Sequence, residues 1–162
     1  MMKTVGKLQL STPDDRQIMM RREFDAPREL VFEALTTPDL LKQWFAGPPG
    51  WTLAVCEFEA RKGGKYRYVW RGSMGEMGMG GVVTDIKSPE LIAATEKFDS
   101  PWYPGDASST IVLTEQGAKT LLTLTVTYAT KEARDLVLMS PMETGVAAAY
   151  DRLEQFLADR RR

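Results

Sequence analysis

The sequence changes its hydrophobic period near residue 51, and this change constrains the fold more than any other feature. From there to residue 128, apolar and polar side chains alternate in six consecutive segments separated by short turns. A period of two is typical of β-strands with one buried face, and short connections between successive strands favour antiparallel pairing. The sequence therefore predicts an antiparallel meander whose strands are 51–60, 65–71, 79–87, 91–98, 107–115 and 118–128.

Helical patterns lie on both sides of this meander. A strand at 17–24 is followed by two short helices, at 27–35 and 37–45, and the second has Pro38 at its first position, where proline's missing N–H costs nothing. The final segment, 140–160, carries apolar residues at spacings of three and four, which predicts an amphipathic helix roughly 30 Å long. We therefore expect an α+β fold in which this helix covers one face of a sheet of about six to seven strands.

The length of the chain, 162 residues, is that of one domain. Residues 1–15 are polar and turn-rich, so we expect a flexible leader before a single domain at 16–162. The start has no apolar core of signal-peptide length, and no segment approaches the ~20 apolar residues of a membrane span. Cys56 is the single cysteine, so no internal disulfide can form, which fits a reducing compartment. A cytoplasmic location is the simplest expectation.

Charge and composition exclude several kinds of function. Lys and Arg (21) nearly balance Asp and Glu (22), which leaves a net charge of −1 and argues against a nucleic-acid partner. The chain has no histidine, the commonest metal ligand and the commonest general base in proteins. We therefore predict no metal site, no cofactor and no catalysis that depends on histidine.

Five stretches of the sequence resemble one known family. They are DAPRELVFEALTTPDLLKQW at 25–44, EARKGGKYRYVWRG at 59–72, GGVVTDIKSPELI at 80–92, TLLTLTVTY at 120–128 and TGVAAAYDRLEQFL at 144–157. Together they resemble the bacterial START-like proteins of the SRPBCC superfamily, and more narrowly the branch named for the activator of the heat-shock ninety ATPase. The resemblance implies a helix-grip fold, as in birch-pollen-allergen-like proteins, with a cavity between the curved sheet and the C-terminal helix.

This implied cavity suggests a role for the aromatic residues. One strand aims Tyr66, Tyr68 and Trp70 at a single face, opposite a helix half that is rich in small residues. We therefore expect a pocket for a small hydrophobic or aromatic molecule, bound without covalent chemistry, and an ordinary packed core is the alternative. Arg67 and Glu96 are candidates for orienting a polar end of the ligand. The expected lining is Trp44, Tyr66, Tyr68, Trp70, Phe98, Met142, Val146 and Ala149.

Two other functions stay open at this point. The family name implies a co-chaperone-like module that stimulates a heat-shock chaperone ATPase in a stress response. The second alternative is a hydrolase or cyclase that uses Glu and Tyr in the same cavity. Exposed strand edges also make a homodimer a candidate, on family analogy alone.

The enzyme alternative depends on which way certain carboxylates face. Glu57 and Glu59 share one face of a regular strand, and two carboxylates in an apolar pocket can act as acid and base. A structural interpretation competes with this one, because Glu59 and Arg61 are also placed to brace the turn at Gly63-Gly64.

Overall fold

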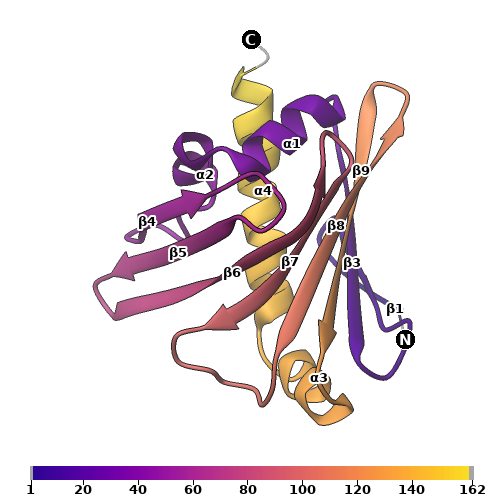
Figure 1. Ribbon diagram of the computed structural model, residues 1–162. Coiled ribbons are helices and arrows are strands. Elements are labelled where there is room, and N and C mark those ends of the chain that lie inside the picture. The colour runs from indigo at the N-terminus through magenta and orange to yellow at the C-terminus, as the bar shows by residue number, and fades with distance from the viewer. Residues whose placement is uncertain (1, 161–162) are drawn as a thin grey trace.

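The structure of the protein, a computed structural model that describes residues 2–160, has one antiparallel sheet curved around the C-terminal helix (Figure 1). Its strands lie in the order β1-β2-β3-β9-β8-β7-β6-β5-β4. They are β1 (Met2–Val5), β2 (Leu8–Ser11), β3 (Gln17–Phe24), β4 (Thr52–Phe58), β5 (Lys65–Gly72), β6 (Gly75–Lys87), β7 (Leu91–Phe98), β8 (Ala107–Gln116) and β9 (Lys119–Tyr128).

Four helices occur in the described part of the chain. α4 (Met142–Arg160) lies along the concave face of the sheet, and α1 (Arg28–Thr36) and α2 (Pro38–Trp44) connect β3 to the far edge strand, β4. α3 (Lys131–Leu138) joins β9 to α4. This architecture confirms the predicted α+β helix-grip fold, although the sheet has nine strands rather than six or seven. None of the helices between residues 2 and 160 is long and apolar enough to cross a bilayer.

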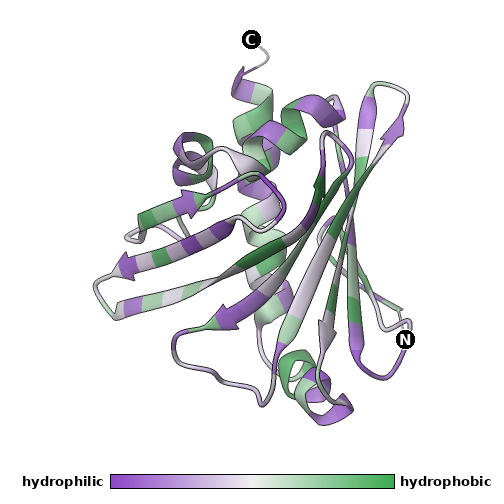
Figure 2. Ribbon diagram, in the orientation of Figure 1, coloured by the Kyte–Doolittle hydropathy of each residue, from purple (hydrophilic) through white to green (hydrophobic). Residues whose placement is uncertain are grey.

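Alternation along the strands turns one face of the sheet toward α4. Figure 2 shows hydrophilic and hydrophobic residues alternating along several strands, as expected for a sheet with one face on the core. In β5, Tyr66, Tyr68 and Trp70 are at most 8% exposed, whereas Lys65 and Arg71 lie in solvent. The predicted register of this strand is therefore correct.

The start of the chain differs from the flexible leader expected at residues 1–15. There β1 and β2 form a hairpin that extends the sheet beyond β3, with Leu10 opposite Met20. Leu8 and Leu10 are fully buried, and Lys3 forms an ion pair with Glu143 of α4. The expectation was wrong because two alternating leucines are too short a pattern to indicate a strand without the neighbour that they pack against.

The segment before α4 is also helical, and it is anchored at both its start and its middle. The Thr130 hydroxyl caps α3 by accepting a hydrogen bond from the Ala133 N–H at 3.1 Å. The buried Arg134 guanidinium donates to the carbonyl oxygens of Asp14 and Gln17, at 2.7 and 3.2 Å. These bonds fasten α3 to the start of β3.

The core is packed tightly at one end of α4 and loosely at the other. In the second half of the helix, Leu153 and Leu157 are at most 1% exposed, and the Tyr150 ring meets Phe24 edge-on with centroids 5.7 Å apart. The first half presents Gly145 and Ala149 to the sheet. Side chains of this size leave space between helix and sheet, and the candidate site occupies that space.

Candidate functional site

A cavity of about 360 Å³ lies between the concave face of the sheet and the first half of α4. Its wall combines side chains from α2, the loop after β7, several strands and α4. Gly145 lies at an exposed part of this wall, where a Cβ atom added to it would have no atom within 4 Å. The small side chains of α4 thus make room for a guest molecule in an otherwise packed domain.

One end of the cavity is an aromatic wall whose two indole N–H groups are already paired. The ring of Phe45 packs edge-on against Tyr68 and Trp70, with centroids 5.5 and 5.2 Å apart. The indole N–H of Trp70 donates to the carbonyl oxygen of Phe45 at 2.7 Å, and that of Trp44 donates to Ala34 at 2.9 Å. Because these donors are used by the backbone, this end offers a ligand mainly apolar surface.

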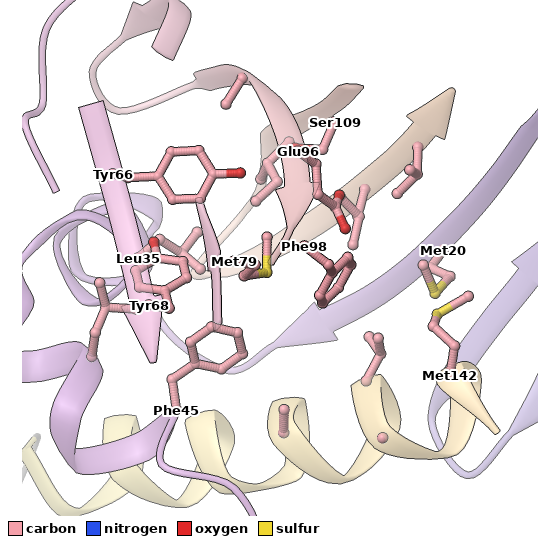
Figure 3. A pocket seen from close by; sticks show the side chains of 18 of the residues that line it. Met20, Leu35, Phe45, Tyr66, Tyr68, Met79, Glu96, Phe98, Ser109 and Met142 are labelled. Atoms are coloured by element: carbon pink, nitrogen blue, oxygen red, sulfur yellow. The ribbon is translucent and has the colours of Figure 1, made fainter. Parts of the chain in front are cut away.

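The other end of the cavity contains a carboxylate. Figure 3 shows the Glu96 side chain projecting into the cavity beside Phe98. Among the described residues, no side chain or backbone group forms a hydrogen bond or ion pair with this carboxylate. Burial raises the pKa of Glu96 to about 7, since removal from water disfavours the charged form. Glu96 therefore changes its charge near neutral pH.

Three tyrosines surround this carboxylate. Burial, and then the charge of Glu96, raise the pKa values of Tyr66, Tyr103 and Tyr128. The Tyr66 hydroxyl donates to the carbonyl oxygen of Thr95 at 2.6 Å. The rings of Tyr103 and Tyr128 are perpendicular, with centroids 5.2 Å apart. The phenols thus stay neutral around physiological pH and leave Glu96 as the titrating group.

All eight residues expected to line a pocket lie on the wall of this cavity, and so does Glu96. Arg67 does not, and the prediction that it reaches the cavity is wrong. It alternates with Tyr66 and Tyr68 along β5, so its side chain points to the opposite face. There its guanidinium binds both carboxylate oxygens of Asp99, at 2.8 and 2.6 Å. A role in binding for the other nine stays a prediction.

The carboxylates considered for catalysis lie outside the cavity. Glu57 is exposed, and Glu59 accepts hydrogen bonds from the Lys65 N–H at 2.7 Å and from Arg61 at 3.1 Å. These contacts lower the pKa of Glu59, the backbone N–H bond most strongly. They confirm that Glu59 and Arg61 brace the turn, and they remove Glu57 and Glu59 as an acid–base pair in the cavity.

The expected lining includes Tyr66 but omits the other two tyrosines at the polar end. Tyr103 belongs to the loop between β7 and β8, and Tyr128 is the last residue of β9. Alternation says little about side-chain direction in loops and at strand ends. The sequence signal was the aromatic pair Trp102-Tyr103 in a loop, where large rings must pack against something to be buried.

A second hollow, of about 340 Å³, adjoins the cavity at α4. Gly145 and Met77 line both spaces, so they lie at the boundary between them. The second hollow is also bounded by Trp51 and Arg152. Because the Met77 side chain is 48% exposed, this boundary is accessible from solvent.

We expect Glu96 to make the stability of the ligand-free protein pH-dependent. Its pKa of about 7 in the folded state lies above the ~4.3 of an exposed glutamate, so the folded state binds the extra proton. Its contribution is therefore complete below about pH 4 and is lost as the pH rises through 7, by about 3 kcal/mol in all.

The Glu96→Gln variant should lack this loss, because its amide does not ionise. Urea unfolding of both proteins at pH 5.5 and pH 8 measures the effect, and the variant should be the more stable protein at pH 8. Parallel pH profiles for the two proteins would contradict the expectation.

A curved antiparallel sheet that grips a C-terminal helix around an internal cavity defines the helix-grip class of proteins. Within this class, the chain belongs to the family described as activator of Hsp90 ATPase homolog 1-like protein, whose model matches residues 25–158. The family that the sequence resembles is thereby confirmed. The comparison with curated proteins found no match.

Solved structures agree with this assignment. A crystal structure of a protein from Rhodobacter sphaeroides is 35% identical, with a TM-score of 0.87 over 94% of this chain and 99% of the other. One from Nitrosomonas europaea is 25% identical, with a TM-score of 0.80 over 93% of this chain and 99% of the other. These proteins share the fold over nearly their whole length.

Proposed function

We propose that the protein binds a small, predominantly apolar molecule in the cavity between its sheet and α4, without covalent chemistry of its own. The observation that carries this proposal is the cavity itself, about 360 Å³ of space walled by aromatic and aliphatic side chains. That volume is at the lower end of the range for ligand sites, about 300–1,000 Å³. A compact aromatic molecule matches it in size and polarity.

The arrangement of polar groups supports binding rather than catalysis. Glu96 is the single carboxylate among the described residues that line the cavity. No Lys, Arg or Cys of the described chain lines it, and Ser109 is its single serine. A hydrolase or cyclase of the kind considered above needs a second group to complete proton transfer. The neighbouring tyrosines have raised pKa values, so they stay protonated at neutral pH and provide no phenolate to act as a base.

Filling the cavity from α4 should abolish binding while the fold stays intact. In Gly145→Leu, the new side chain enters the open space beside the helix, and the helix gains up to about 1 kcal/mol from the loss of a glycine. We expect the affinity for the neutral fluorophore phenylnaphthylamine to fall by at least about tenfold, or ~1.4 kcal/mol. Fluorescence titration measures the affinity, and thermal unfolding checks that the variant is folded.

The matched control is Gly145→Ala, which has the same backbone advantage and adds one methyl group. It should be more stable than the wild type and bind the fluorophore within about threefold. A folded Gly145→Leu protein with wild-type affinity, or a wild-type protein without saturable binding, would contradict the proposal.

The family description supports a second candidate, stimulation of a chaperone ATPase. It names an activator of the Hsp90 ATPase, and that property applies to this chain only as a hypothesis. The test is ATP turnover of the Hsp90 from the same cell, measured with and without the protein. An unchanged rate would remove this candidate and leave the cavity proposal unaffected.

A further inference from the structure

We propose that the cavity selects ligands in which a protonated amine is joined to an apolar or aromatic body, with the amine held by Glu96 among Phe98, Tyr103 and Tyr128. This inference rests on the proposed function and specifies the class of ligand. It follows from the charge at the polar end of the cavity, from the aromatic rings around that charge, and from the position of the apolar wall.

The charge at the polar end has no counter-ion in the protein. Glu96 is the one residue with a formal charge among the described residues that line the cavity. Arg67, the cation expected from the sequence to reach the cavity, lies on the other face of β5 and is paired with Asp99. A partly buried carboxylate without a partner costs free energy, so a ligand that brings a positive charge offsets this cost on binding. An anionic ligand would increase it.

The aromatic rings around Glu96 also favour a cation. Phe98 and Tyr103 are nearly perpendicular, with centroids 6.3 Å apart, and Tyr103 is perpendicular to Tyr128. All three rings line the same cavity as Glu96. Aromatic faces carry partial negative charge and attract ammonium groups, most strongly where water is excluded. The carboxylate and the aromatic rings therefore both attract a protonated ligand amine.

The rest of the cavity would hold the apolar body. Figure 3 places Glu96 and Phe98 on the sheet side, with Phe45 and Tyr68 farther along the same cavity. The indole donors at that end are bonded to the backbone, so an apolar group displaces no bound polar partner there. The ligand class is thus a compact aryl-alkyl amine rather than a polyamine or a free amino acid.

None of the described groups around Glu96 changes its own protonation near neutral pH. They are Tyr66 from β5, Tyr103 from the loop after β7 and Tyr128 from β9, all with raised pKa values. β6 contributes Met79, β8 contributes Ser109, and α4 contributes Met142 and Val146, none of which ionises. Amine binding should therefore strengthen as the pH rises and Glu96 loses its proton. A neutral ligand that accepts a hydrogen bond from protonated Glu96 should show the opposite trend.

The test compares phenylbutylamine with phenylbutanol, which share an apolar body and differ in the charged group. Isothermal titration of the full chain at pH 5.5 and pH 8 gives the affinities. We expect the amine to bind at least about tenfold more tightly than the alcohol at pH 8, and this ratio to shrink at pH 5.5. In Glu96→Gln, alcohol binding should persist and the preference for the amine should disappear.

The outcomes separate this inference from the proposed function. If the alcohol binds as tightly as the amine at pH 8, or if the amine binds more tightly as the pH falls, the inference is wrong and the proposed function stands. A preference that persists in a folded Glu96→Gln protein also overturns it. If neither compound binds to the wild type, both proposals fail. The wild-type pH comparison decides the matter even if the variant does not fold.

Discussion

Removing both acidic partners of Arg22, in an Asp151→Ala/Glu154→Ala variant, is expected to lower the free energy of unfolding by about 3 kcal/mol. The Arg22 side chain is 1% exposed, and its guanidinium lies 2.8 Å from Asp151 and 3.6 Å from Glu154 on α4. It also lies over the Phe24 ring, 5.1 Å from the centroid. Without its partners, a buried charge stays uncompensated. Breaking a buried ion pair costs about 3–5 kcal/mol. Because Asp151 is largely exposed, we expect a loss of stability at the lower end of that range.

Two further variants show whether buried charge is the cause. Adding Arg22→Met to the double variant replaces the charge with an apolar chain of similar length, and much of the lost stability should return. Asp159→Ala removes an exposed acid from the same helix and should change stability by no more than about 0.5 kcal/mol. Urea unfolding measures all of these proteins. A triple variant no more stable than the double variant would contradict the explanation.

The substitution Leu153→Ala is expected to cost about 2–5 kcal/mol. Leu153 is fully buried in the tightly packed half of α4, so its removal leaves a new void between helix and sheet. Since α4 is the helix around which the sheet curves, we expect the whole domain to unfold at a lower denaturant concentration, with the slope of the transition unchanged.

Val146→Ala, in the loose half of the same helix, is the matched comparison. It enlarges an existing cavity instead of creating one, so it should cost about 1 kcal/mol or less. Equal losses for Val146→Ala and Leu153→Ala would show that the two halves of α4 are packed alike. That result would also count against an open cavity in solution.

Hydrophobic period was sufficient to predict the architecture. Alternation placed the meander and the cavity face of β5, and spacings of three and four placed α1, α2 and α4. These patterns are local consequences of burying one face of an element. The eight wall residues expected from the sequence follow from these patterns, once α4 is known to cover the concave face of the sheet.

Strand irregularity explains which way Glu57 faces. The pairing between β4 and β5 shifts between Leu53 and Val55, so one extra residue interrupts the alternation. Leu53 and Cys56 are consequently both buried, and Glu57 faces solvent. A bulge of this kind inverts every later residue of a strand, and no local pattern in the sequence marks it.

The polar end of the cavity could be predicted only in part. Glu96 was a candidate from alternation, but its lack of a counter-ion depends on every element that surrounds it. Tyr103 reaches it from a loop, and Tyr128 reaches it from β9, with β8 between the two residues. Such contacts depend on tertiary packing, so no short stretch of the sequence predicts them.

The hairpin of β1 and β2 has a consequence for self-association. Its strand β2 pairs with Met19, Met20 and Arg21 in the middle of β3, and so covers part of an edge whose unpaired backbone groups would otherwise face other molecules. The sheet ends instead on β1, four residues long and carrying the charged Lys3. A short, charged edge is a poor template for a neighbouring strand, so this side is protected against aggregation. A dimer built by strand pairing would have to form at the opposite edge, along β4.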